Sequence, residues 1–166
     1  MATVERTQYL DFDDDCGTVL RMLTDADFYR AKYEALGFEG LQITIETPED
    51  ADFGVLARYR TESELPLPSW ARKALPDTIR VEQRDCWDSA RSHGSIEIGI
   101  HGAPVRISAR MTLTPYEGGA RNRVDWAFGC RVPVIGKRVA ELVAEDVCAK
   151  AERDHAFVRA QIAHYR

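Results

Sequence analysis

Three charged residues spaced four apart lie near the end of this sequence: Asp146, Lys150 and Asp154. On a helix, residues four apart lie on one side. Val143 and Phe157 fall on that same side, so the charges share a face with apolar residues. Buried charges are costly unless they are paired or hydrated. The three charges therefore indicate either the border of a hydrated cavity or an ordinary surface ladder.

Both interpretations of these charges stay open, although we prefer the plainer one. In that interpretation the helix is tilted, its second half is partly exposed, and the charges form an i,i+4 ladder worth about 0.2–0.5 kcal/mol per pair. In the other interpretation the charges fix the polar end of an otherwise apolar ligand.

A second polar group lies in the segment Thr78–Asp88, which has the alternation of a strand. One face of this strand carries Ile79, Val81, Gln83, Asp85 and Trp87. If that face points inward, Gln83 and Asp85 meet the helix charges across a cavity. Alternatively, a β-bulge turns Gln83 and Asp85 to solvent, or Arg84 accompanies Asp85 in a salt bridge at the sheet edge.

The sequence contains no clear motif for metal binding, nucleophilic catalysis or nucleotide binding. His93 and His101 lie near turns, and His155 and His164 are not one helical turn apart. No zinc-protease motif, nucleophile elbow, phosphate-binding loop or dinucleotide fingerprint occurs in context. The run Asp13–Asp15 lacks the spacing of a calcium loop and is better suited to capping a helix. We expect no metal and no cofactor.

The cysteines are scattered without a C-x-x-C spacing, at Cys16, Cys86, Cys130 and Cys148. We expect them to be reduced and buried as small apolar residues.

These groups must be positioned by strands followed by one long helix. We expect a strand at Thr3–Phe12, a short helix after Asp15 to about Thr24, and a helix at Phe28–Leu36 capped by Asp25 or Asp27. Further strands are expected at 40–46, 53–60, 78–88, 95–102, 105–114 and 121–132, with turns at Ser92–Gly94 and Glu117–Gly119. The helix Val134–Tyr165 follows, and the proline-containing segment Pro66–Pro76 is a connector or a lid.

A sheet curled around this final helix buries the apolar faces of both. A curved sheet and one helix do not always fill the space between them, and apolar hollows take up apolar guests. The residues expected to line such a cavity are Tyr59, Gln83, Asp85, Trp87, Ile98, Met111, Trp126, Phe128, Val143, Asp146, Val147, Lys150, Asp154 and Phe157.

Length and charge bound the remaining possibilities. The chain has 166 residues, a net charge of −5 and a pI near 5.4. We expect one domain, residues 1–166, that is a monomer or a weak homodimer and does not bind nucleic acid. The sequence shows neither a signal peptide nor an apolar stretch of about 18 residues, so we expect a cytoplasmic protein without integral membrane association.

The order of elements and several short motifs resemble the START-like (Bet v 1-like, SRPBCC, polyketide cyclase/dehydrase) superfamily. Within it, the chain resembles the actinobacterial family catalogued as domain of unknown function 2505. The motifs are Leu23-Thr24-Asp25, Tyr29-Arg30-Ala31, Ala35-Leu36-Gly37, Leu75-Pro76, Val81-Glu82 with Trp87, Gly102-Ala103-Pro104-Val105, and Val132-Pro133-Val134-Ile135-Gly136-Lys137 leading to Glu141-Leu142-Val143-Ala144-Glu145. The last is the most specific.

This resemblance implies an α+β helix-grip fold: a curved seven-stranded antiparallel sheet around the final helix, two short helices after the first strand, and a hydrophobic cavity. It implies binding of a lipid, polyketide, isoprenoid-like or other apolar molecule, and supplies no catalytic residues. The alternatives are a cyclase or dehydratase using Asp85, Asp146, Lys150 or Asp154, and an interaction module with a filled core and a basic outer face at Arg106, Arg110, Arg121 and Arg123.

Overall fold

The computed structural model describes residues 1–166 apart from 64–68, 70–71 and 73–75. Its strands are β1 (Ala2–Phe12), β2 (Glu39–Glu46), β3 (Phe53–Glu62), β4 (Thr78–Asp88), β5 (His93–Ile100), β6 (Val105–Tyr116) and β7 (Gly119–Cys130). Its helices are α1 (Cys16–Leu23), α2 (Ala26–Leu36) and α3 (Gly136–Gln161), followed by the 3-10 turn η1 (Ile162–Tyr165).

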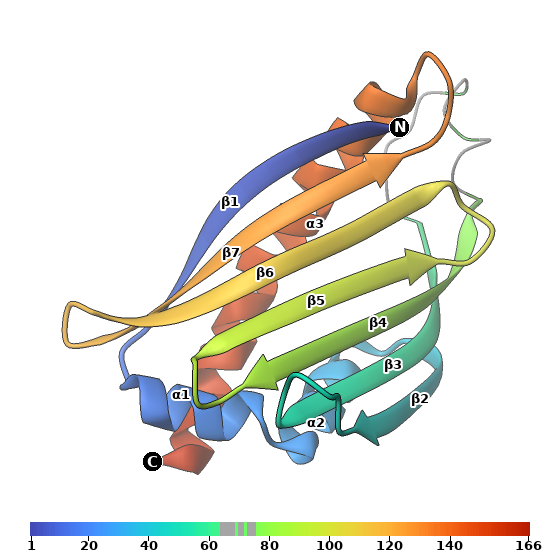
Figure 1. Ribbon diagram of the computed structural model, residues 1–166. Helices are drawn as coiled ribbons and strands as arrows, with labels where there is room; N and C mark the ends of the chain where they lie inside the picture. The colour runs from blue at the N-terminus through green and yellow to red at the C-terminus, as the bar shows by residue number, and fades with distance from the viewer. Residues whose placement is uncertain (64–68, 70–71, 73–75) are drawn as a thin grey trace.

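The seven strands form one curved antiparallel sheet in the order β1-β7-β6-β5-β4-β3-β2 (Figure 1). Consecutive strands from β2 to β7 are neighbours, and β1 closes against β7. Alternation decides the two faces: along β6, Val105, Ile107 and Ala109 are buried whereas Arg106 and Arg110 are exposed. The expected helix-grip architecture is confirmed.

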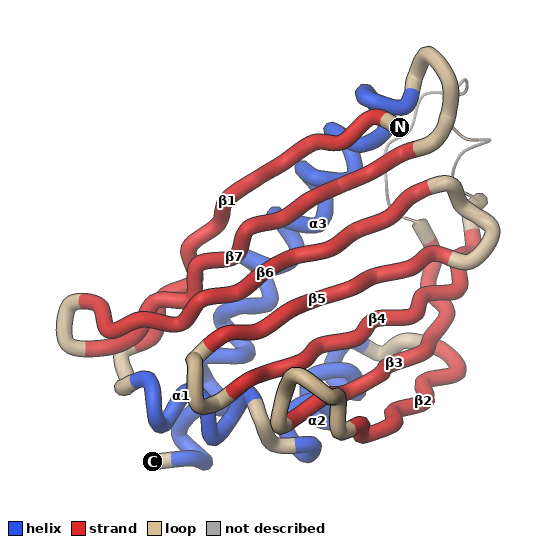
Figure 2. The backbone as a smooth tube through the Cα atoms, viewed as in Figure 1, coloured by secondary structure: helices blue, strands red, loops and turns tan. Residues whose placement is uncertain are grey.

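All three helices lie on one face of the sheet, which we call the inner face (Figure 2). The long helix α3 packs along β1 and β7, and α2 lies near β2. The buried part of α3 is its beginning, where Val139, Ala140, Val143 and Ala144 are enclosed. The inner face is therefore covered by α3 on one side and by the α1–α2 pair at one end.

The two short helices begin where acidic side chains cap them. Asp15 accepts a hydrogen bond from the Thr18 amide at 2.8 Å, and Asp25 accepts one from the Asp27 amide at 3.1 Å. α2 ends at Gly37, whose φ of 69° is in the left-handed region that glycine adopts without strain.

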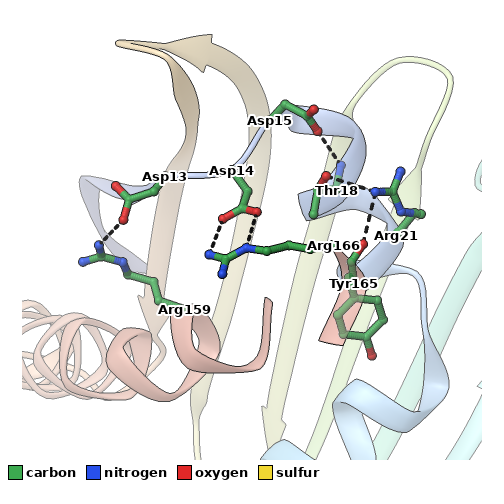
Figure 3. A network of polar contacts seen from close by, with 8 residues as sticks. All are labelled: Asp13, Asp14, Asp15, Thr18, Arg21, Arg159, Tyr165 and Arg166. Carbon is green, nitrogen blue, oxygen red and sulfur yellow. Dashed lines mark hydrogen bonds and ion pairs between the residues drawn. The ribbon is translucent and has the colours of Figure 1, made fainter. Parts of the chain in front are cut away.

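The other two aspartates of the acidic run bind the end of the chain (Figure 3). Asp13 pairs with Arg159 at 3.0 Å, and Asp14 holds the Arg166 guanidinium through two hydrogen bonds of 2.8 and 2.9 Å. Arg21 of α1 donates to the Tyr165 carbonyl at 3.1 Å. The run therefore ties the β1–α1 junction to η1.

The final helix begins later than expected, at Gly136 instead of Val134. Val134 has a φ of 68° and a fully exposed side chain, so it belongs to a turn. At Gly136 a β-carbon would lie 3.1 Å from the Cys130 carbonyl oxygen, so the chain enters the helix through a close backbone approach. The α-helix ends at Gln161, and the last turn tightens to a 3-10 helix.

The fifth strand begins two residues earlier than expected, at His93. His93 pairs with Asp88 and Thr112, so the expected turn at Ser92–Gly94 is correct only at Ser92: the turn covers residues 89–92, and His93 and Gly94 are in the strand. A β-carbon on Gly94 would lie 2.8 Å from the Trp87 ring. Glycine is needed here because the indole lies across the strand, not because the chain turns.

Three further expectations concern the proline-containing connector, membrane-spanning helices and the cysteines. The connector predicted at Pro66–Pro76 lies mostly outside the described residues. Within the described ranges, no helix is long and apolar enough to cross a membrane. All four cysteines are free; Cys130 is buried, whereas Cys16, Cys86 and Cys148 are only partly buried.

Candidate functional site

The inner face of β4 carries a buried carboxyl group. Asp85 is 5% exposed and lies between Val55 of β3 and Ile96 of β5 in an unbroken register. The side chain of Gln83, one inward position along, donates a hydrogen bond to Asp85 Oδ1 at 3.1 Å. The alternative in which a bulge turns Asp85 to solvent is therefore wrong.

Burial raises the pKa of Asp85, and the nearby Lys32 ammonium and the Gln83 hydrogen bond offset this only in part. A carboxyl group in this state tends to keep its proton, so it acts as a hydrogen-bond donor as well as an acceptor. The salt bridge expected between Arg84 and Asp85 is also wrong, because Arg84 lies on the outer face and pairs with Glu46 at 3.0 Å.

Three tyrosines surround this carboxyl group closely enough for its charge to raise their pKa values, although burial is the larger cause: Tyr29, Tyr33 and Tyr59. The Tyr29 hydroxyl donates to the Leu23 carbonyl at 2.8 Å. The Tyr33 hydroxyl is buried and has no hydrogen-bond partner among the described residues. A buried hydroxyl without a protein partner is costly.

Tyr59 continues the cluster toward the end of β3. Its ring stacks on Phe38 with centroids 4.1 Å apart and lies 5.8 Å from the Tyr33 ring. Tyr59, Ile98 and Ile100 belong to the inner face, yet each is only partly buried. The cluster thus joins a polar end at Asp85 to an apolar surface that the helices do not fully cover.

Sequence reasoning missed Lys32, Tyr29 and Tyr33 as members of this group. The available signal was the i,i+4 spacing of the two tyrosines on α2, which places both hydroxyl groups on one side of the helix. That signal does not say which strand the helix faces. Only the packing of α2 brings them to Asp85.

The three charges of α3 do not form one ladder. Lys150 pairs with Asp146 at 2.9 Å, as the plainer interpretation predicts, but Asp154 pairs with its neighbour Arg153 at 3.3 Å. The side chains of Asp146, Lys150 and Asp154 are 25%, 36% and 26% exposed. The second half of α3 is therefore partly exposed, as expected for a tilted helix.

The remaining predicted residues divide by burial. Trp87, Met111, Trp126, Phe128 and Val143 are buried in the core, whereas Ile98, Val147 and Phe157 are partly exposed. Trp126 and Phe128 stack with centroids 5.7 Å apart. Tyr59 and Gln83 are likewise only partly buried.

A polar bridge holds α3 to the sheet away from the tyrosines. Gln8 of β1 is buried, accepts a hydrogen bond from the Trp126 indole at 3.2 Å and donates to the Cys148 carbonyl at 2.9 Å. Sequence analysis did not identify Gln8 because the inner face of its strand could not be assigned. Its partners satisfy both ends of the amide, so the bridge is structural.

No group of three or more histidine, cysteine, aspartate or glutamate side chains is placed to hold a metal ion within the described residues. This face offers a buried carboxyl group with a raised pKa and a tyrosine hydroxyl beside an apolar surface. Groups of this kind form hydrogen bonds with oxygen atoms and are suited to proton transfer.

Several solved structures share this architecture. The chain superposes on Ara h 8.0201 with a TM-score of 0.66 at 12% identity, covering 98% of this chain and 99% of that one. The Zhui aromatase/cyclase from Streptomyces sp. R1128 gives 0.63 at 12% identity, covering 98% and 94%. Norcoclaurine synthase from Thalictrum flavum, solved with dopamine and hydroxybenzaldehyde, gives 0.60 at 11% identity, covering 95% and 87%.

These identities are low, so the similarity establishes the fold and not the activity. No curated protein matches the sequence. A family model does match it over residues 8–162, from the middle of β1 to the start of η1, and its description is "Protein of unknown function (DUF2505)". The chain belongs to the DUF2505 family.

Proposed function

We propose that the protein binds an apolar small molecule between the inner face of β3–β5 and α3, with the polar end of the ligand on Asp85 and Tyr33. The observation that carries this proposal is the buried Asp85 carboxyl group beside a Tyr33 hydroxyl that lacks a partner among the described residues. Polar groups of this kind are few in ligand sites and fix the orientation of an otherwise apolar ligand.

The apolar part of the site consists of side chains that the core leaves partly uncovered. Tyr59, Ile98 and Ile100 contribute from the sheet, and Val147 and Phe157 contribute from α3. Covering such surface yields about 25 cal/mol per Å², so about 300 Å² of apolar contact contributes roughly 7 kcal/mol before the entropic cost of binding. This favours lipids, polyketides or isoprenoid-like molecules over small polar metabolites.

The polar end selects a neutral oxygen. Since Asp85 tends to keep its proton, it donates to a ketone, hydroxyl or phenol oxygen, and the Tyr33 hydroxyl supplies a second donor or acceptor. The similarity to an aromatase/cyclase and to norcoclaurine synthase supports a ligand of this class at the level of the fold.

Binding is tested with the neutral fluorescent probe N-phenyl-1-naphthylamine. Ile98→Trp fills the proposed space from the sheet side and is expected to weaken binding by about tenfold. Glu97→Trp adds the same ring at the next residue of β5, on the outer face, and is the matched control. No saturable binding by the wild type, or equal loss in both variants, contradicts the proposal.

The ligand class is identified by native mass spectrometry of protein purified from cells, followed by denaturation and analysis of released molecules. A reproducible adduct that disappears on denaturation names the class to be tested. A clean apo mass that persists after incubation with lipids, polyketides and isoprenoids favours the interaction-module alternative.

A second candidate function is a cyclase or dehydratase in which Asp85 is the acid. The raised pKa of Asp85 favours it, because a carboxyl group whose pKa is raised toward the working pH is better suited to general acid catalysis. The released ligand or its precursors are incubated with the protein, and loss of water is followed by mass spectrometry. Turnover that Asp85→Asn abolishes while binding persists supports the enzyme; binding without turnover supports the carrier.

A further inference from the structure

The outer face of the sheet carries a groove whose charged side chains differ from those of the inner site, although Tyr59 and Ile100 belong to the lining of both. It has a volume of about 620 Å³ and lies over the ends of β3, β4 and β5, on the face turned to the viewer in Figure 1. Its charged lining is Arg58, Arg60, Arg80 and Glu82, and His101 lies beside them.

Two glycines leave room for this groove. Gly99 of β5 has nothing within 4 Å of the position that a β-carbon would take, so the floor is open there. Gly40 has a φ of 63° and lies at the irregularity between Glu39 and Gln42, where β2 bends against β3. The Arg60 guanidinium approaches the β-carbon position of Gly40 to 3.4 Å, so Arg60 lies along the wall.

The cations of the groove exceed its anions. Arg58 is bonded to Glu82 and is neutralised by it. Arg60 and Arg80 are direct partners in the β3–β4 register, which places their side chains next to each other on one face. Within the described residues neither forms an ion pair with a carboxylate. Like charges directly opposite each other destabilise a sheet unless a counter-charge lies between them.

His101 lies beside this pair. Its backbone amide donates to the Arg80 carbonyl at 2.8 Å, which continues the row from Arg60 through Arg80 to His101. The chain as a whole has a net charge of −5, so this excess of positive charge is local and does not reflect the composition.

We propose that this groove binds a phosphate group, carried either by a soluble phosphate monoester or by a phospholipid headgroup. Two guanidinium groups that form no ion pair with a carboxylate among the described residues match the two negative charges of a phosphate monoester, whereas a carboxylate supplies only one. Arginine forks bind phosphate oxygens through paired hydrogen bonds, and glycines at the floor let the anion approach the sheet.

The first experiment is titration of the protein with inorganic phosphate at pH 8, followed by calorimetry and by amide chemical shifts. We expect saturable binding with shifts centred on Gly99 and His101. The double variant R60Q/R80Q is expected to bind about tenfold more weakly. The control R110Q/R123Q removes two charges from the other side of the same outer face and is expected to bind as the wild type does.

The exposed positions of Arg60 and Arg80 make these variants compatible with folding, which circular dichroism checks. The conservative Arg80→Lys keeps the charge but loses the fork, so its binding should fall between the wild type and R60Q/R80Q.

Sedimentation with phosphatidylcholine vesicles containing phosphatidic acid separates the two sources of phosphate. Retention that depends on Arg60 and Arg80 identifies a headgroup, and binding of free phosphate without retention identifies a soluble monoester. The proposal is overturned if neither phosphate nor vesicles bind, or if R60Q/R80Q and R110Q/R123Q weaken binding equally.

Discussion

The two halves of the inner face are built differently. The sealed half, formed by β1, β7 and the first half of α3, encloses Val124, Phe128 and Val139 almost completely. The tyrosine half, formed by β3, β4, β5 and α2, buries Asp85 and leaves Ile98 partly exposed. One half is an ordinary apolar core, and the other combines a buried acid with apolar surface that remains accessible.

The difference follows from the sizes of a helix and a sheet. Strands lie about 4.8 Å apart, so seven of them span nearly 30 Å, whereas a helix is only about 10–12 Å across. Because α3 packs along β1 and β7, it cannot also cover β2–β5. The fold therefore seals one side of the sheet and leaves the other to the short helices.

The largest expected change in the free energy of unfolding distinguishes the two halves of the inner face by how tightly they are packed. Phe128→Ala removes a fully buried ring and is expected to lower the free energy of unfolding by about 3–5 kcal/mol. Ile98→Ala, on the partly exposed surface, is expected to lower it by less than about 2 kcal/mol. Urea denaturation measures both, and similar losses would show that the tyrosine half is packed as tightly as the sealed half.

A smaller loss of stability is expected when the Gln8 bridge between α3 and the sealed half is broken. Gln8→Ala leaves the buried Trp126 indole N–H without its acceptor, so we expect a loss of about 1–3 kcal/mol. In a Trp126→Phe background the same substitution should be less destabilising, because the orphaned donor is gone. Thr7→Ala, at the exposed neighbouring position, is the control. Equal losses in both backgrounds would mean that the two side chains are not coupled.

The smallest expected change in stability comes from Asp85 in the tyrosine half, and it depends on pH. Folding raises the pKa of Asp85 above 3.8, so between the unfolded and folded values the native state binds more protons than the unfolded state. Stability therefore falls as pH rises through this range, by about 1.4 kcal/mol for each unit of pKa difference.

Asp85→Asn keeps an acceptor for Gln83 and removes this titration. The variant should therefore gain stability relative to the wild type as the pH rises above 3.8, until the folded pKa of Asp85 is passed. Denaturant unfolding at several pH values measures the difference, and parallel curves for the two proteins would place Asp85 in contact with water.

Much of the fold was predictable because local patterns repeat over many residues. The alternation of Val105, Ile107, Ala109 and Met111 requires one buried face, and the capping groups Asp15 and Asp25 mark where the short helices begin. Element boundaries were less predictable, because one close contact decides them. Gly94 resembles a turn residue in the sequence, yet it lies in β5 beneath Trp87.

The candidate site was predictable only in part. Asp85 and Gln83 followed from alternation along one strand, which is a local property. Their partners Tyr33 and Lys32 lie about 50 residues earlier, on a helix whose own pattern does not specify the strand that it faces. The charges of α3 illustrate the converse: spacing predicted the Asp146–Lys150 pair, but Arg153 and not Lys150 pairs with Asp154 at 3.3 Å.

The sequence by itself determined which residues form strands and helices and which face of each is apolar, because backbone geometry repeats with fixed periods of 2 and 3.6 residues. Only the tertiary structure decided that Asp85 lies beside Tyr33, that Gln8 bridges Trp126 to α3, and that Arg60 lies next to Arg80. These juxtapositions depend on strand order, register and helix docking. Such features are set by the packing of the whole chain and leave no periodic trace in any one segment.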